Sequence, residues 1–470
     1  MKSTDALLTA VAVVALAALP GLARVQAASL DAALIAEGRR LFNEETFDGN
    51  GRTCASCHAA ENNFTVDPAF LRTLPGNDPV FTAAPQLRGA LSDLEVNNRL
   101  RQDALFCENV DGLEEICVLR SAPHTLALGT SRGRLGWSGD GSPDGTLLAF
   151  ATGAVVQHAT RTMARNPDDD FTPPTPDQLL ALEAYQLSLG RQADPIIDPA
   201  DEESLAFADP IVEEGRVLFH NAPGRNGTRS CAGCHAGGGA NTRAGENRNF
   251  DTGVALLTSA PACLGGFEAP GDGGLGASPV ETIARRDLCG KGPNDGPKAA
   301  VTFRGDGTFN TPPAIEAADT GPWFHNNAVG GQIEAAVRFY TSDTFDASLA
   351  GDGNAFVLDD GQVNAIGALL RALNAKMNVE DMALRYLTDA LDTDDAAWAE
   401  EAVFLASVEL EDALEVLTTG PVALFAGTDA VPLLREALEL TRQAQAAGAG
   451  GGLIEDAAAA LEAARDEMVE

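Results

Sequence analysis

Two short stretches decide the fold: Cys54-Ala55-Ser56-Cys57-His58 and Cys231-Ala232-Gly233-Cys234-His235. Each has the Cys-x-x-Cys-His pattern, in which two thiols add to the vinyl groups of a haem and the adjacent imidazole binds its iron. The alternative is a zinc site or a redox dithiol, which would require both cysteine pairs to be followed by His by chance. The sequence therefore predicts two covalently bound haem c groups, one held by Cys54, Cys57 and His58 and the other by Cys231, Cys234 and His235.

The residues around the two motifs repeat. The triplets Glu37-Gly38-Arg39 and Glu214-Gly215-Arg216 both begin 17 residues before the first motif cysteine. The apolar spacing around each triplet predicts a helix that leads into the haem motif. Downstream, two further helices are predicted in each half, because residues 147–158 match residues 333–340 and residues 176–189 match residues 361–373.

The predicted fold is mainly α, with two tandem cytochrome c-type haem domains and a C-terminal acidic helical extension. The expected parts are a signal peptide, a first half, a second half and a C-terminal segment, at residues 1–27, 28–192, 193–378 and 379–470. Residues 191–206 are rich in Pro and acids and are expected to link the halves, and residues 263–300 are expected to form a long loop. For the C-terminal segment we favour a solvated helical cap over a partner-docking surface.

The N-terminal residues indicate the compartment of the protein, and its net charge indicates which kinds of partner it can bind. An apolar run over residues 6–22 lies between Lys2 and Val25-Gln26-Ala27, which is typical of a cleaved signal peptide and predicts periplasmic export. An uncleaved membrane anchor is the alternative, but the run is short and contains Pro20 and Gly21, and no other segment is expected to span a membrane. The net charge of −36 argues against a nucleic-acid partner. It suits a basic partner protein or a salty environment, with solubility alone as the alternative.

Four cysteines lie outside the haem motifs. They form two local pairs, Cys107 with Cys117 and Cys263 with Cys289. Disulfides are expected for both pairs in an oxidising compartment, and free thiols are the alternative.

Function depends on the sixth position of each iron, because a filled position transfers electrons whereas an open one can bind peroxide or dioxygen. Residues 310–313 (Asn-Thr-Pro-Pro), 321–326 (Gly-Pro-Trp-Phe-His-Asn) and 336–340 (Ala-Val-Arg-Phe-Tyr) resemble the second-domain signature of bacterial di-haem cytochrome c peroxidases and the related MauG-type enzymes. Residues 121–123 (Ser-Ala-Pro) and 137–139 (Trp-Ser-Gly) are similar to the first-domain counterpart. The resemblance leaves the C-terminal segment unexplained.

The resemblance implies roles for three further residues. Tyr340 occupies the position from which MauG-type enzymes supply a Tyr, and ordinary peroxidases a Met, to the second-domain iron; it is therefore the implied distal ligand of the His235 haem. Trp137 matches a tryptophan between the haems that relays electrons or shares a radical. His325 is implied to lie beside the cofactor, for instance at a haem propionate. Simple packing is the alternative for Tyr340 and Trp137. The family also binds a calcium ion between its domains, mostly through backbone carbonyls that a sequence does not locate.

The two halves differ in the residue that they offer to the sixth coordination position of the iron. Aligning Leu147 with Ile333 places Ala154 where Tyr340 sits, and alanine cannot bind iron. In many family peroxidases a loop His closes this site, but residues 113–115 (Leu-Glu-Glu) offer none. The first haem is therefore expected to have an open distal face.

An open ferric haem needs an acid–base group to move the proton of peroxide. The family generally uses a Glu, whose nearest equivalent here is Thr160. His158 follows Ala154 by one helical turn and is expected to point to the same face, so we predict His158 as the substitute, with His124 as the fallback. A structural histidine is the alternative.

Together these features predict an exported di-haem oxidoreductase in which hydrogen peroxide reacts at the His58 haem while the His235 haem supplies or shares electrons through Trp137. The reductant is a small cytochrome c or a cupredoxin in the peroxidases, and a protein or organic substrate is oxidised by MauG-type enzymes. The rival class is a di-haem electron carrier with both irons six-coordinate, for example with Met163 or His124 bound to the first haem.

Overall fold

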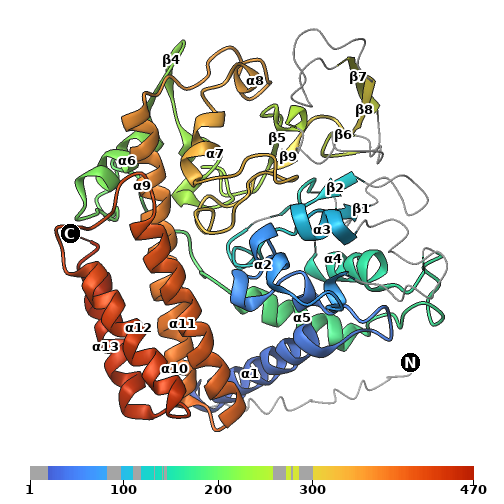
Figure 1. The fold of residues 1–470 in the computed structure, drawn as a ribbon, viewed down its shortest axis with the longest axis vertical. Coiled ribbons are helices and arrows are strands. Elements are labelled where there is room, and N and C mark those ends of the chain that lie inside the picture. Colours follow the sequence, from blue (N-terminus) through green and yellow to red (C-terminus); the bar gives the residue numbers. More distant parts are fainter. Residues whose placement is uncertain are drawn as a thin grey trace, which may run out of the picture.

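Each half is organised around two helices that cross in contact. In the first half α1 (Pro20–Glu44) packs on α5 (Pro176–Ser188), and in the second half α6 (Pro210–Asn221) packs on α9 (Asp360–Met377). The haem motif follows the first helix of each pair, as predicted. Figure 1 shows the first half, in blue to green, beside the second half, in green to orange.

The repeated Glu-Gly-Arg triplets put a glycine at each crossing. A Cβ atom on Gly38 would lie 1.9 Å from the carbonyl oxygen of Ala181, and one on Gly215 would lie 1.9 Å from that of Ala365. Any side chain would collide there, since Cβ atoms in folded proteins do not approach oxygens so closely. The glycines therefore allow the helices to meet backbone to backbone, which gives the repeat a structural reason.

The computed structural model describes residues 20–81, 97–108, 118–131, 133–139, 141, 146–162, 164–257, 271–276, 279–284 and 300–469. Helices dominate, which confirms the prediction of a mainly α protein. The shorter helices of the two halves are α2 (Pro68–Thr73), α3 (Asn97–Asp103), α4 (Leu147–Ala154), a π-helix (Val155–Ala159), α7 (Ile333–Phe339) and α8 (Asp343–Asp346).

The strands are short and form small sheets, some of whose residues line the cavity between the halves. Three antiparallel pairs join β1 (Phe106–Glu108) to β2 (Val118–Arg120), β3 (Ala222–Gly224) to β4 (Gly227–Arg229), and β5 (Asn249–Phe250) to β9 (Phe309–Asn310). In a fourth sheet β8 (Ala300–Arg304) pairs in parallel with β6 (Gly271–Asp272) and antiparallel with β7 (Pro279–Ala284). Strand β7 lies within residues 263–300, so that stretch is not the plain loop that its composition suggested.

Side-chain caps start the crossing helices. Thr175 and Gln178 bond reciprocally at the start of α5, and Asp359 and Gln362 do the same at the start of α9. Each pair satisfies two backbone amide donors that a helix end otherwise leaves open. The Asp209 carboxylate accepts the amide of the second helical residue of α6, so polar local signals fix where three of the four helices begin.

The C-terminal segment continues directly from the second half. Helix α9 passes through a π-helical turn (Asn378–Ala383) into α10 (Leu384–Asp392), and α11 (Ala396–Thr418), α12 (Ala430–Ala446) and α13 (Gly451–Asp466) follow. Figure 1 shows α11–α13, in orange to red, lying side by side along one flank. One hydrophobic core runs without interruption through both halves and this segment, from Leu41 to Met468. The predicted helices are present, and they are integral to the core.

Half-buried acidic groups lie where α11 meets the second half. The carboxylate of Asp319 accepts hydrogen bonds from Asn374 at 2.6 Å and from Asn378 at 3.1 Å. Burial raises the pKa of Asp319, and burial together with the negative charges of Asp319 and Glu415 raises the pKa of Asp412 on α11. This contact therefore favours protonated carboxyl groups.

The predicted linker has no helix or strand, but it is packed between the halves. The Nε of Arg191 donates to Asp194 at 2.8 Å, and its Nη1 donates to the buried carboxylate of Glu316 in the second half. Ile197 is 1% exposed. Residues 191–206 therefore hold the two halves together instead of separating them.

Several expectations concern residues outside the described part. Cys107 is disulfide-bonded, but its predicted partner Cys117 lies outside the described residues, as do Cys263, Cys289 and Met163. The same is true of residues 1–19 of the predicted signal peptide. None of the described helices combines the length with the apolar character that crossing a bilayer requires.

Candidate functional site

The two Cys-x-x-Cys-His motifs adopt the same turn. Each begins with a single turn of 3-10 helix, Cys54–Ser56 in the first half and Cys231–Gly233 in the second. The amide of His58 donates to the carbonyl of Cys54 at 3.0 Å, and that of His235 donates to Cys231 at 2.9 Å. The sequence repeat is therefore also a repeat of local geometry.

The motif thiols lie in an apolar setting. Burial and the neighbouring cysteine raise the pKa of Cys54 to about 12, and the same two causes raise the pKa of Cys231 to about 12. A reactive redox dithiol requires the opposite shift, because its thiolate must form near neutral pH. Within the described residues, no group of three or more His, Cys, Asp and Glu side chains could hold a metal ion.

Both motif imidazoles are tied to the backbone through the same nitrogen. The Nδ1 of His58 lies 3.0 Å from the carbonyl oxygen of Phe64, and the Nδ1 of His235 lies 3.2 Å from that of Gly239. Burial lowers the pKa of both histidines, against a smaller opposing effect of these carbonyls. The rings are therefore neutral with the proton on Nδ1, so each Nε2 offers a lone pair to a metal.

One continuous cavity of about 600 Å³ connects the two motifs. Its walls include His58 and His235, so both imidazoles face the same space. The volume lies within the range of cofactor pockets, and most of the wall is apolar, as a large aromatic macrocycle requires. The cavity and the paired histidines fit a group that binds through Cys-x-x-Cys-His.

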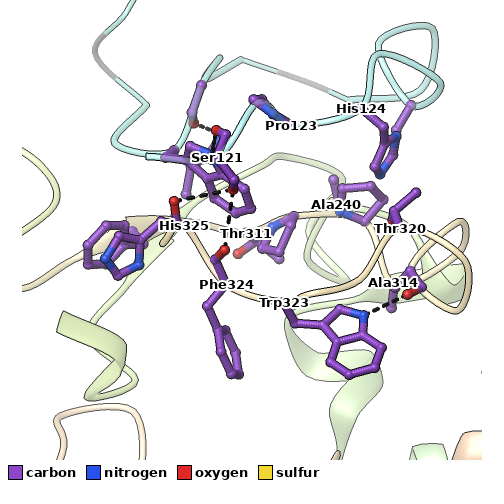
Figure 2. Close-up of a pocket in the computed structure, with 18 of the residues that line it drawn as sticks. Ser121, Pro123, His124, Ala240, Thr311, Ala314, Thr320, Trp323, Phe324 and His325 are labelled. Atoms are coloured by element: carbon purple, nitrogen blue, oxygen red, sulfur yellow. Dashed lines mark hydrogen bonds between the residues drawn. The ribbon is translucent and has the colours of Figure 1, made fainter. Parts of the chain in front are cut away.

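The two halves meet along the repeated segments that line this cavity. The amide of Ser121 donates to the carbonyl of His325 at 2.8 Å, and its hydroxyl donates to the same carbonyl at 3.2 Å. Figure 2 shows Ser121 on the first-half segment pointing at Phe324 and His325 on the second-half segment. Signature segments of the first and second halves are therefore direct neighbours in space.

Trp137 bridges the halves. Its indole Nε1 donates to the carbonyl of Ser121 at 2.8 Å, and its own carbonyl accepts the amide of Asn310 in the second half at 2.8 Å. The ring lines the cavity and packs against the second-half cluster that also contacts Cys231 and Tyr340. Trp137 thus contacts both halves at the wall of the cavity that both motifs line.

Tyr340 lies at the end of α7 and faces the second motif. Its ring lines the cavity and is surrounded edge-on by Phe339, Phe345 and Phe356, with the closest centroid at 5.1 Å. Burial raises the pKa of Tyr340, and the nearby motif cysteines Cys234 and Cys231 add to the effect. Tyr340 and Cys231 pack against the same apolar cluster. Both Tyr340 and His235 therefore border the second-motif end of the cavity.

The corresponding first-half helix ends differently. Helix α4 stops at Ala154 and continues as a π-helix over Val155–Ala159, so the turn between Ala154 and His158 is wider than the α-helical turn expected from sequence. Both residues nevertheless line the cavity, and the charge of His158 acts on His58. The carbonyl of His158 is held by the Nδ2 of Asn50 at 2.8 Å. Isolated π turns are frequent at functional sites.

His124 lies in the same part of the cavity. Burial, followed by the charges of Arg191 and His58, lowers the pKa of His124 to about 3. Its Nδ1 is buried and has no hydrogen-bond partner. The ring is therefore neutral near pH 7, and its Nδ1 is a buried polar atom without a hydrogen bond.

His325 belongs to a buried polar network that the sequence did not reveal. Its ring stacks on Phe309 with centroids 4.1 Å apart, and its Nε2 lies 3.8 Å from the Oδ2 of Asp272. Asp272 in turn accepts two hydrogen bonds from Arg120, at 2.6 Å and 2.9 Å. Burial lowers the pKa of His325 to about 4, with Asp272 and Arg120 acting in opposite directions.

Sequence reasoning missed Arg120, Asp272 and Gln157 as residues of the site. Arg120 and Gln157 line the cavity, and Asp272 fixes Arg120 from the second half. Arg120 precedes the Ser121-Ala122-Pro123 repeat element directly, which was the one local signal available. Comparisons of the chain with protein-family models, with curated proteins and with solved structures found no match.

Proposed function

We propose that this chain is an exported di-haem c-type oxidoreductase that reduces hydrogen peroxide, as cytochrome c peroxidases do, or uses it to oxidise a protein or organic substrate, as MauG-type enzymes do. The observation that carries the proposal is the single cavity joining two identical Cys-x-x-Cys-His turns, each with its histidine anchored through Nδ1. Bound haem would supply redox-active iron that accepts the oxidising equivalents of peroxide.

Two residue sets would hold the cofactors. Cys54 and Cys57 would form the thioether links of the first haem and His58 would offer its Nε2. Cys231, Cys234 and His235 would do the same for the second. Raised thiol pKa values and the lack of a described metal-binding group argue against the zinc and redox-dithiol alternatives.

The two ends of the cavity offer different groups to a cofactor. Tyr340 presents a phenol at the second-motif end, where it would be the distal ligand, whereas the aligned residue of the first half is Ala154, which has no donor atom. The first site would therefore remain open to a small molecule such as peroxide. This difference supports an enzyme over an electron carrier.

The residues of the open end can hold and move protons. His158 and His124 both line the cavity and interact with His58. The low pKa of His124 keeps that ring neutral near pH 7 but also makes it a weak base, so His158 is the first candidate for accepting the proton of peroxide. Trp137 hydrogen-bonds to residues of both halves, which supports a role in sharing an electron hole between the two cofactors.

The second candidate function is a di-haem electron carrier. It is favoured by the buried Nδ1 of His124, which has no hydrogen-bond partner and could be satisfied by an iron atom. In that case the first site would be closed, and peroxide would not react there.

Electron paramagnetic resonance of the resting protein separates the two functions. If the protein is an enzyme, we expect a high-spin ferric signal that is absent from His58→Ala. A second signal, assigned to the His235 haem, should remain in that variant. Two low-spin signals would reject the enzyme. A long-lived oxidised species after stoichiometric peroxide would favour the MauG-type reaction, and rapid decay with added reduced cytochrome c or cupredoxin would favour the peroxidase.

A further inference from the structure

An arginine stands two residues before each haem motif, Arg52 in the first half and Arg229 in the second. The Nε and Nη2 of Arg52 donate to the carbonyl of Val80 at 3.2 Å and 2.7 Å. The Nη1 and Nη2 of Arg229 donate to the carbonyls of Gly351 at 3.1 Å and Ala350 at 2.8 Å. The sequence repeat therefore includes a cation that fastens each motif to a backbone segment further along the chain.

In the first half, two residues of the strip before the motif, residues 49–52, also bind the end of the π-helix that carries His158. The Nδ2 of Asn50 donates to the carbonyls of His158 at 2.8 Å and Thr160 at 2.9 Å. The amide of Asn50 donates to the carbonyl of Ala159 at 2.8 Å. The Nη1 of Arg52 makes a weaker contact, at 3.4 Å, with the His158 carbonyl. The strip therefore binds three consecutive carbonyls.

These hydrogen bonds supply what the end of a helix lacks. The last carbonyls of a helix have no partner within it and must be satisfied from outside. The π-helix ends beside the strip, because the backbone of Thr160 is already extended. Gly49 allows the close approach, since a Cβ atom there would lie 1.8 Å from the carbonyl oxygen of Ala159. The strip thus holds the π turn in place.

Phe106 contacts the His158 side chain from another element, strand β1. The two rings meet edge-on with centroids 6.4 Å apart, and the guanidinium of Arg52 lies 5.6 Å from the Phe106 centroid. Phe106 is buried and, like His158, lines the cavity. Both the backbone and the ring of His158 are therefore held, which reduces the number of orientations that the imidazole can adopt.

The strip also joins the π turn to the point where the first haem would be attached. Asn50 and Arg52 precede Cys54 by four and two residues. A haem attached at Cys54 and an imidazole fixed by Asn50 would therefore keep a constant separation. At the matching position of the second half, four residues before Cys231, stands Gly227, which has no side chain to donate. The arrangement belongs to the half whose sixth position is predicted to be open.

We propose that Asn50 and Arg52 are positioning residues that hold the His158 imidazole over the His58 site, where it takes the proton of a small, weakly acidic ligand. The proposal rests on the proposed function, because it requires a haem bound through His58. It names the ligand class as well: molecules that bind iron as anions but arrive protonated, such as hydrogen peroxide or hydrogen cyanide. The bond to the proton breaks, its electron pair stays with the anion that binds, and a new N–H bond forms on the imidazole.

Stopped-flow binding of cyanide to the ferric holoprotein tests the proposal. Hydrogen cyanide is protonated near neutral pH, so an acid–base group accelerates its binding as the anion. The readout is the absorbance change that is absent from His58→Ala. A positioned acid–base group contributes about 10²–10⁴-fold, and a small misplacement removes about 10²-fold, so we expect Asn50→Ala and Arg52→Met each to slow binding by about tenfold to a hundredfold. Arg52→Lys, which keeps a cationic donor, should recover part of the rate.

Arg101→Met is the matched control. Arg101 also donates to backbone carbonyls of the first half, those of Leu71 at 3.0 Å and Leu74 at 2.8 Å, and its guanidinium lies 3.9 Å over the ring of Phe81. It lies outside the wall of the cavity, so its loss should leave the cyanide rate unchanged. Carbon monoxide binds reduced haem without losing a proton, and its rate should stay close to that of the wild type in every variant.

A second series, built on His158→Ala, separates positioning from a general structural role. If Asn50 and Arg52 act through the imidazole, Asn50→Ala and Arg52→Met should cause no further slowing once His158 is alanine. Slowing of the same size with and without His158 would overturn the proposal. Circular dichroism and haem content establish that each variant is folded and loaded. If the buried Arg52→Met fails either check, the half-buried Asn50→Ala still decides the question.

The outcomes also distinguish this proposal from the proposed function. If both ligands bind the His58 haem and cyanide binds Asn50→Ala and Arg52→Met at the wild-type rate, the positioning role is wrong and the proposed function stands. If cyanide binding depends on Asn50 and His158 although peroxide does not react, the positioning role stands and the proposed function is wrong. If neither carbon monoxide nor cyanide binds the His58 haem, the first site is closed and both are wrong.

Discussion

The Nε of Arg120 lies 2.6 Å from the Oδ2 of Asp272, and the two residues, 152 positions apart in sequence, form a buried ion pair between the halves. Removing one partner of such a pair leaves an uncompensated buried charge. Arg120→Met is expected to lower the free energy of unfolding by about 3–5 kcal/mol at pH 7, measured by urea denaturation. Arg120→Met combined with Asp272→Leu should recover much of the loss.

The ion pair between Arg120 and Asp272 should also make the stability of the protein depend on pH. Burial alone would raise the pKa of Asp272, but Arg120 and His325 outweigh burial and lower it. A carboxyl with a lowered folded-state pKa stabilises the protein above its unfolded-state pKa of about 3.9, and this contribution is lost as the pH falls through the folded value. The difference between wild type and Arg120→Met should therefore be larger at pH 7 than at pH 3, and an equal difference at both would contradict this account.

The repeated glycines predict a matched pair of destabilised variants. Gly38→Ala and Gly215→Ala each place a methyl group into a backbone carbonyl of the crossing helix. Overpacking of this kind costs about 1–3 kcal/mol or more, so thermal unfolding should shift downward in both. Gly427→Ala is the control, because no atom lies within 4 Å of the added Cβ; a similar shift in all three would show that the crossings are not the cause.

The buried carboxyl groups at α11 predict an opposite pH effect. Because the pKa of Asp412 is raised in the folded state, the folded protein binds more protons than the unfolded chain once the pH exceeds about 3.9, so this contribution to stability decreases as the pH rises towards the raised pKa. Asp412→Asn should stabilise the protein at pH 7 and flatten the profile of unfolding free energy between pH 4 and 7. Asp394→Asn, at the exposed start of α11, should leave the slope unchanged.

Tyr340 should set the potential of the second cofactor. Methionine ligands favour the reduced iron, and axial ligands span about 0.8 V of potential, so Tyr340→Met should raise the potential of the His235 haem by a sizeable part of that range in a spectroelectrochemical titration. Phe339→Leu alters only the adjacent packing and should cause a small shift. An unchanged potential in Tyr340→Met would remove Tyr340 as a ligand.

His158 should accelerate the reaction with peroxide. A positioned acid–base group contributes about 10²–10⁴-fold, so His158→Ala should slow stopped-flow peroxide reactivity by that order at neutral pH. Thr152→Ala, on the preceding helix α4, serves as the control. If His158→Ala reacted with peroxide as fast as the wild type across the pH range, His124 would become the candidate acid–base group.

The sequence predicted what is local and repeated. The 17-residue offset, the helices before and after each motif and the paired motif turns follow from spacing and apolar periodicity, because each is determined within a few tens of residues. The crossings of these helices did not follow, since each joins segments more than a hundred residues apart. Trp137 was singled out by resemblance, and its role stays a prediction. The ion pair between Arg120 and Asp272 was not predicted, because side chains that meet across 152 residues leave no periodic signal in the chain.

The C-terminal segment shows the same limit. Its helices were predictable from composition, but their apolar faces do not reveal which surface they cover. The hydrogen bond from Arg385 of α10 to the carbonyl of Ser188 depends on how α10 docks against the first half, so periodicity alone offered no sign of it. The π-helix at His158 was missed because no residue of that turn breaks an α-helical pattern.

The uninterrupted helical run from Asp360 to Asp392 means that the sequence repeat is not a unit of independent existence. A fragment ending at residue 378 would cut a helix in mid-course and strip the apolar cover from its inner face. Because both halves and the C-terminal segment share one hydrophobic core, removing any one of the three would expose apolar side chains of the others to solvent.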